Sequence, residues 1–192
     1  MFSNMKIPYR IALALAAPLI GVLVLAAESI YKDYKIYNQM EFVAIIGETV
    51  AELGELSHTL QAERGATASY LASSETKVTE KLIKYRKHTD HEFERFHALV
   101  EKLKHGTHPE MNEGLAHIED DLAGLAEFRQ KVDTKSATGK DNLNYYKKIV
   151  ADIIELGFHA ASYSTNSEIS LSIVALLNLS EMKEYAGQER GL

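Results

Sequence analysis

The sequence contains no cysteine and no tryptophan, and only three of its 192 residues are proline. Without cysteine the chain forms neither a disulfide framework nor a thiolate metal site. The absence of cysteine does not indicate whether the protein lies in an oxidising or a reducing compartment. Aliphatic residues and alanine dominate instead, and so few prolines favour α-helix through most of the chain. The length fits one domain with an adequate core rather than two.

The sequence also has no block of basic residues. Acidic and basic side chains are interspersed, and the formal net charge is −6. Nucleic acid is therefore not an expected partner. No glycine-rich phosphate loop follows a strand, and no serine has an evident base nearby in the sequence. The chain is therefore not expected to be an enzyme, and neither a cofactor nor a catalytic residue is expected.

One long hydrophobic run is present, at the N-terminus. Residues 11–27 read IALALAAPLIGVLVLAA and carry no charge, while Lys6 and Arg10 precede them. Counted from residue 7, the segment has roughly the 20 residues that a bilayer requires, and Arg10 can extend toward the headgroups. The two basic residues predict an N-terminus in the cytoplasm.

This run predicts a membrane anchor over residues 1–27 and an extracytoplasmic domain over residues 28–192. A bacterial inner membrane, with the domain in the periplasm, is the expected location. A cleaved signal peptide remains the alternative, because Ala26 and Ala27 could mark a cleavage site. The apolar run exceeds the usual signal-peptide length, and the helical pattern continues past it, which favours the anchor.

Beyond the anchor, apolar residues repeat at alternating spacings of three and four, which is typical of helices in a bundle. The first such helix extends to about Leu71, and Ser73 and Ser74 are expected to cap the second. Gly106 and Pro109 separate the second helix from the third, and residues 134–139 form the next turn. The expected fold is all-α, an up-and-down helical bundle preceded by one transmembrane helix. The inward-facing series are Val43, Ile46, Val50, Leu53, Ser57, Leu60, Arg64, Thr67 and Leu71, then Val78, Leu82, Tyr85, Thr89, Phe93, Phe96, Val100 and Leu103, then Leu115, Ile118, Leu122, Leu125 and Val132.

Residues 162–167, SYSTNS, predict a further break between two helices, 140–161 and 168–190. Serine, threonine and asparagine compete with the helical backbone for hydrogen bonds and favour a turn. With the break, the last helix returns to the end of the bundle at which Arg64 lies. Without it, Arg64 and Arg190 would lie at opposite ends of the bundle.

The triplet Glu-Arg-Gly occurs twice, at residues 63–65 and 189–191, and each copy places an arginine on a predicted inward face. Two buried guanidinium groups require an anion, and together they could bind a small planar one through paired charge-assisted hydrogen bonds. The alternative is that Glu63, Glu189 or other acids neutralise two ordinary surface arginines. The predicted supporting residues are Gly65, Thr67, Lys183 and Gly191. The last helix is expected to face inward through Ile169, Ser172, Leu176, Leu179, Lys183 and Ala186.

Four segments carry a resemblance to a known family. They are LQAERGATASYL (60–71), LAEFRQKVD (125–133), NLNYYKKIVADIIEL (142–156) and LSEMKEYAGQERG (179–191). Over roughly residues 45–191 the chain resembles the nitrate- and nitrite-sensing (NIT) domain of bacterial chemoreceptors and related signalling proteins.

The resemblance implies a membrane-anchored helical sensor that binds nitrate or nitrite through Arg64 and Arg190. Signal transduction as in a methyl-accepting chemotaxis receptor follows from it, and a homodimer is the expected assembly. The arginines could meet within one chain or across that dimer. The family continues past its second arginine, whereas this sequence stops at Leu192, so a fragment of a longer receptor with an incomplete site is the expectation.

Two other functions remain open. Glu55 and His58, like Glu94 and His97, have the Glu-x-x-His spacing of carboxylate-bridged di-iron bundles. Both histidines lie beside the predicted seam rather than on it, so a metal site is not expected. A structural bundle that binds only partner helices is the second alternative.

Overall fold

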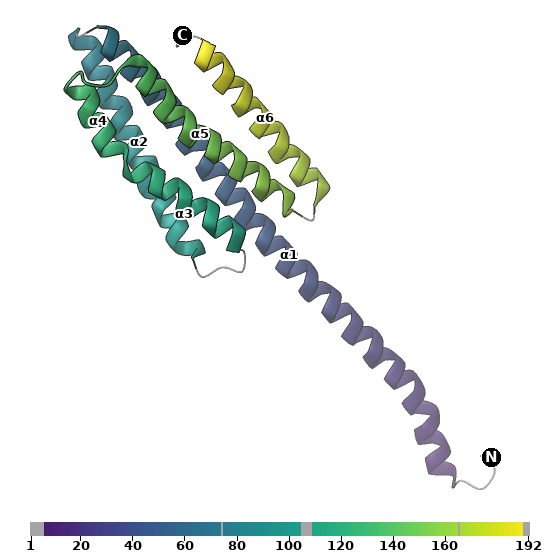
Figure 1. The fold of residues 1–192 in the computed structure, drawn as a ribbon. Helices are drawn as coiled ribbons and strands as arrows, with labels where there is room; N and C mark the ends of the chain where they lie inside the picture. The colour runs from purple at the N-terminus through teal and green to yellow at the C-terminus, as the bar shows by residue number, and fades with distance from the viewer. Residues whose placement is uncertain (1–5, 74, 105–108, 165, 190–192) are drawn as a thin grey trace. The chain divides into compact units, whose positions relative to one another are not determined.

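The structure is a computed structural model that describes residues 6–73, 75–104, 109–164 and 166–189. The chain divides into two compact units, Met1–Phe42 and Val43–Leu192. Every regular element among the described residues is an α-helix. In chain order the helices are α1 (Ile7–Ala72), α2 (Thr76–Leu103), α3 (Pro109–Ala123), α4 (Leu125–Asp133), α5 (Gly139–Ser162) and α6 (Ser167–Glu189) (Figure 1).

The N-terminal unit consists of the first part of α1. The helix over Ile7–Tyr37 is long and apolar enough to cross a membrane: its most apolar 18-residue window has a mean hydropathy of 2.3, and no described side chain of that window is buried by the protein. The helical pattern continues without a break from the apolar run into the bundle, as the sequence predicts, because α1 ends only at Ala72. Length and composition thus permit a membrane span.

The second unit is a helical bundle whose core follows the predicted series on the first three helical segments. Side chains at these positions are buried or half-buried from Val43 to Val132. The largest fully buried ones include Leu53 and Leu60 of α1, Phe96 of α2 and Ile118 of α3. Alternating spacings of three and four therefore locate the inward faces of these helices correctly.

The third predicted helix is divided into α3 and α4 at Gly124. The Tyr145 hydroxyl of α5 donates a hydrogen bond to the backbone carbonyl of Asp121 over 3.1 Å. A Cβ added at Gly124 would lie 3.5 Å from that hydroxyl oxygen. A side chain that binds a helical carbonyl is a common cause of a local break, and a glycine leaves room for its ring.

The predicted connections are largely confirmed. Residues 134–138 form the turn before α5, and Thr138 caps α5 in a capping box with Asp141. Pro109 is the first residue of α3, a position where its missing N–H has no cost. Gly106 lies outside the described residues.

The prediction for Ser73 and Ser74 is wrong in its detail. The N-cap of α2 is Glu75, which makes no capping hydrogen bond through its side chain. The Ser73 hydroxyl instead accepts a hydrogen bond from the backbone N–H of Glu75 over 3.4 Å. Ser74 lies outside the described residues.

The predicted break in SYSTNS is confirmed. Helix α5 ends at Ser162, and α6 begins at Ser167 after a turn at Tyr163. The Asn166 side-chain oxygen accepts hydrogen bonds from the backbone N–H groups of Glu168 and Ile169, which caps the first turn of α6. The chain thus reverses, and α6 runs back along α5 (Figure 1).

The predicted inward face of α6 is wrong. Ser172, Leu176, Leu179, Lys183 and Ala186 are exposed, and the buried residues are instead Ile173, Leu177 and Glu184. The close approach of α5 sets this rotation, because Leu177 packs over Gly157, where an added Cβ would lie 2.6 Å from the Leu177 Cδ2 atom.

Candidate anion-binding site

The Arg64 side chain is buried, as its place on the α1 seam predicts, and it is paired with an acid of α6. Arg64 is 6 % exposed and Glu184 is 4 % exposed. The Arg64 Nη1 atom donates to the Glu184 Oε1 atom, which makes a buried ion pair between residues 120 positions apart. Arg64 is thus neutralised by an acid, but it is not a surface arginine.

Two amides complete the surroundings of Glu184. Gln188 donates to its Oε1 atom over 2.9 Å, and Gln61 donates to its Oε2 atom over 3.0 Å. Both carboxylate oxygens therefore accept hydrogen bonds, as a buried charge requires. The guanidinium and the two amides form a small set of donors around one planar anionic group.

A hollow of about 770 Å³ lies beside this pair. It is lined by residues of α1, α2, α5 and α6, among them Arg64, Gly65, Lys81, Asn142 and Gly187. The Asn142 side chain is buried and donates to the backbone carbonyl of Arg64 over 3.1 Å, which ties α5 to the turn of α1 that carries the arginine. The hollow gives a small solute access to the guanidinium.

The C-terminal end of α6 lies at the level of Arg64, as the reversal of the chain predicts. A Cβ added at Gly187 would lie 2.8 Å from the Arg64 Nη2 atom, so a larger residue there would require the guanidinium to shift. Gly187 stands three residues before Arg190. Arg190 itself and Gly191 lie outside the described residues.

The three supporting residues that the structure describes differ in their relation to the hollow. Gly65 lines it, and an added Cβ there would meet open space. Thr67 is fully buried on the seam but does not line the hollow. Lys183 is exposed and contacts His58, with 2.6 Å between its Nζ atom and the His58 Nδ1 atom, and partial burial lowers its pKa. The structure therefore brings Gly65, but not Lys183, to the hollow beside Arg64.

Glu63, the neighbour of Arg64, faces a different part of the bundle. It is fully buried, and Arg129 of α4 donates a hydrogen bond to each of its carboxylate oxygens, from Nε to Oε1 over 2.7 Å and from Nη2 to Oε2 over 2.8 Å. The Tyr146 hydroxyl of α5 donates to the Glu63 Oε1 atom over 2.9 Å. Burial, followed by the negative charge of Glu63, raises the pKa of Tyr146 well above its usual value.

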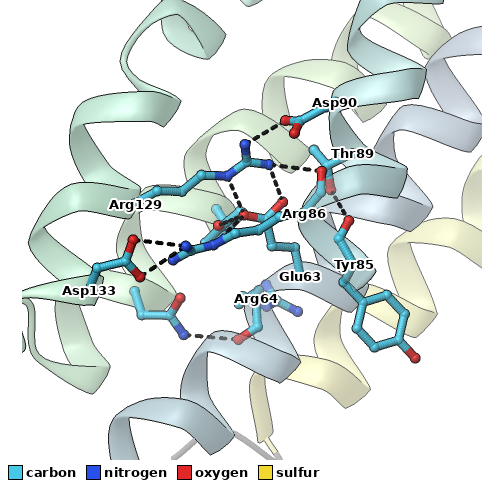
Figure 2. A network of polar contacts seen from close by, with 10 residues as sticks. Glu63, Arg64, Tyr85, Arg86, Thr89, Asp90, Arg129 and Asp133 are labelled. Carbon is cyan, nitrogen blue, oxygen red and sulfur yellow. Dashed lines mark hydrogen bonds and ion pairs between the residues drawn. The ribbon is translucent and has the colours of Figure 1, made fainter. Parts of the chain in front are cut away.

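Figure 2 shows Glu63 at the centre of a larger charge network. Arg129 also binds Asp90 of α2, and Arg86 binds Asp133 of α4 over 2.9 Å. The Arg86 Nε atom lies 3.9 Å from the Glu63 Oε1 atom. Burial by itself would lower the pKa of Arg129, but the hydrogen bonds to Glu63 and its negative charge raise the pKa of the guanidinium above its ordinary value. The network joins α1, α2, α4 and α5 in the same region as Arg64.

The two neighbouring charged residues of the triplet 63–65, Glu63 and Arg64, bind different partners. Successive residues of a helix point about 100° apart, so Glu63 reaches Arg129 while Arg64 reaches α6. Glu184 was not predicted as a partner of Arg64, because Lys183 rather than Glu184 was expected on the inward face of α6. Arg129 and Tyr146 were likewise not predicted as partners of Glu63, although both lie in the segments that carry the family resemblance.

The two Glu-x-x-His pairs do not converge. Glu55, His58, Glu94 and His97 are all exposed, and His97 contacts Glu119 while His58 contacts Lys183. Within the described residues the metal-ligand atoms that do approach one another belong to His117, Asp121 and Asp152. Lys148 already pairs with the Asp121 carboxylate there. The arrangement of a di-iron bundle is not found among these residues.

Comparison with known proteins agrees with this architecture. The nitrate regulatory protein of Klebsiella oxytoca is 24 % identical over 155 residues, which are 81 % of this chain and 39 % of that protein. The solved structure of the NasR transcription antiterminator matches with a TM-score of 0.76 at 23 % identity, over 81 % of this chain and 42 % of that one. This chain therefore spans about two fifths of the length of either relative, and the structural likeness concerns the fold.

The family comparison covers the bundle and the turns that carry the site. A model of the family described as nitrate and nitrite sensing matches residues 55–192, which include Glu63, Arg64 and Glu184. This match confirms the resemblance that the four sequence segments predict. The chain belongs to the nitrate- and nitrite-sensing family.

Proposed function

We propose that this protein is a sensor module that binds nitrate or nitrite between α1 and the C-terminal end of α6, with Arg64 and Arg190 as the anion ligands. The ligand is bound and released without chemical change. Gly65 leaves open space beside Arg64, and Gly191, Thr67 and Lys183 are the other supporting residues of the proposal. Membership of a nitrate- and nitrite-sensing family supports this class of ligand.

The observation that carries the proposal is the position of the Arg64 guanidinium. It is buried on the core side of α1, borders an accessible hollow, and touches α6 at Gly187. A buried arginine is stable only with an anionic partner. A planar anion matches the fork of the guanidinium through two parallel hydrogen bonds. Arg190, three residues beyond Gly187 in the sequence, is the second arginine proposed for such a site.

Ligand binding would act on the bundle through the relative positions of α1 and α6. A ligand shifts an equilibrium between two helix arrangements only by its difference in affinity for them. An anion bound to side chains of both helices contributes such a difference, because its contacts depend on their separation. A small shift of packed helices is an established way to transmit such a signal.

The proposal predicts that nitrate stabilises the folded protein. Thermal unfolding of the full chain in detergent, measured by circular dichroism, should show a midpoint that rises with nitrate concentration. At about 100 times the dissociation constant the gain should be about 2.7 kcal/mol, since the ligand binds only the folded form. Sodium sulfate at equal ionic strength is the control, and its tetrahedral dianion should stabilise less. A bundle that binds only partner helices predicts no rise with nitrate, and that result would exclude the proposal.

We also propose that residues 7–27 remain as a membrane anchor and that the bundle lies outside the cytoplasm of a bacterial cell. The uncharged run and the basic residues Lys6 and Arg10 support this arrangement. Mass spectrometry of the mature protein from membranes should detect a peptide that includes residues 11–27. A mature N-terminus at Ala27 or Glu28 would instead show a cleaved signal peptide.

We also propose that the sensor signals to a further module, and that the whole protein is of the chemotaxis-receptor type. The two relatives, a nitrate regulatory protein and a transcription antiterminator, support control of transcription as the alternative output. A homodimer is the proposed assembly. Five large apolar side chains of α6 are more than half exposed and offer a surface to a second copy; they are Leu171, Leu176, Leu179, Met182 and Tyr185.

A further inference from the structure

The Glu184 carboxylate is surrounded by hydrogen-bond donors, as a bound anion would be. Its carboxylate is a planar group with a single negative charge, and it accepts hydrogen bonds from Arg64, Gln61 and Gln188. Nitrate and nitrite are also planar anions of single charge, and they require the same kind of donors. The donors around Glu184 are therefore suited to the ligand as well as to the carboxylate.

The approach of α6 restricts where an anion can reach Arg64. The Nη2 atom lies against the backbone at Gly187, and the Nη1 atom is bound to Glu184. The Arg64 guanidinium is already paired with Glu184, and both side chains are more than nine-tenths buried. An anion that binds the same guanidinium must therefore compete with this carboxylate for its hydrogen bonds.

We propose that Glu184 is an internal competitor at this site: its carboxylate holds Arg64 when the site is empty, and nitrate or nitrite replaces it on the same guanidinium. This inference rests on the proposed function. Glu184 then sets the affinity for the anion, because each binding event must break the ion pair. It also couples binding to α6, because the carboxylate that leaves Arg64 is carried by that helix.

The displaced carboxylate has a place to move to. A second hollow, of about 380 Å³, lies between α5 and α6 and is lined by Glu184, Gln188 and Lys147 among others. A rotation of the Glu184 side chain toward this hollow would move the carboxylate away from α1. Exchange of the two anions thus transfers the carboxylate from a contact with α1 to the side of α5. The contact between α1 and α6 changes while the charge of the bundle core stays balanced.

The inference predicts that Glu184→Gln binds nitrate more tightly than the unchanged protein. The glutamine keeps the size of the side chain but removes its negative charge, so the ion pair that an incoming anion must break is lost. Isothermal titration of the full chain with sodium nitrate should show a dissociation constant lower by about tenfold, which corresponds to about 1.4 kcal/mol. Glu168→Gln is the matched control, since Glu168 is exposed in the first turn of α6, at the opposite end of the helix from Glu184, and the affinity of this variant should be unchanged.

A second variant covers the case in which Glu184→Gln does not fold. Glu184→Asp keeps the charge but shortens its reach to Arg64, and it should also bind nitrate more tightly, by a few-fold. If the unchanged protein binds nitrate and either folded variant binds it equally or more weakly, Glu184 is not a competitor and the inference is wrong, while the proposed function stands. If the unchanged protein binds neither nitrate nor nitrite, the proposed function fails and the inference fails with it.

Discussion

Replacement of Glu63 with alanine should lower the free energy of unfolding by about 3–5 kcal/mol, the range for breaking a buried ion pair. Glu63 is fully buried, Arg129 grips both of its oxygens, and Tyr146 donates to it. Removal of the carboxylate leaves the Arg129 guanidinium without its main counter-charge in the bundle core. Urea unfolding monitored by circular dichroism measures the change.

Asp90→Ala is the matched control for this prediction. Asp90 binds the same arginine, but its side chain is 54 % exposed, so its loss should cost at most about 1 kcal/mol. The double variant Glu63→Ala with Arg129→Ala should lose less than the sum of the two single variants, because no unpaired charge remains between them. A cost for Glu63→Ala no larger than that for Asp90→Ala would show that the network does not hold the bundle together.

The second large effect is the loss of nitrate-dependent stabilisation in Arg64→Ala and in Arg190→Ala. Each change removes half of the proposed charge-assisted hydrogen bonds to the anion, which contribute about 1.5–3 kcal/mol each. A gain of about 2.7 kcal/mol at 100 times the dissociation constant should therefore fall close to zero at the same nitrate concentration. Lysine should restore the response only in part at either position, because an ammonium group lacks the planar fork.

The structure changes what is expected of the empty Arg64 variant. Two facing arginines without an anion would repel, and the removal of one would then leave the fold intact or more stable. Arg64 is instead paired with Glu184, so Arg64→Ala leaves a buried carboxylate with only amide donors and should lower the unfolding midpoint. Differential scanning fluorimetry without nitrate tests this.

Arg95→Ala controls for the loss of a positive charge, because Arg95 binds Glu52 and Glu92 on the exposed side of the bundle. Its nitrate response should be unchanged. If Arg64→Ala and Arg190→Ala both keep the full response, the two Glu-Arg-Gly triplets are structural and the proposed site is wrong.

The sequence by itself determined the helices and most of the core. On α1 and α2 apolar residues alternate with charged ones, so one helical face stands out, and Leu53, Leu60 and Phe96 are buried where the spacing predicts. The break before α6 was equally predictable, because short polar side chains in SYSTNS bind backbone groups locally. Both the spacing of apolar residues along a helix and the polar break depend only on residues that are close together in the sequence, so the sequence alone is enough to predict them.

Only the tertiary structure decided the rotation of α6 and the partners of the buried charges. The apolar residues of α6 are distributed over nearly every face of the helix, so several series with spacings of three and four fit it equally well. The series that was predicted to face inward was wrong. Packing of Leu177 on Gly157 selects the face, and that rotation brings Glu184 rather than Lys183 to Arg64. The pairing of Glu63 with Arg129 likewise joins residues 66 positions apart. Charge pairs at such separations depend on how helices rotate and pack against one another, which local periodicity does not specify.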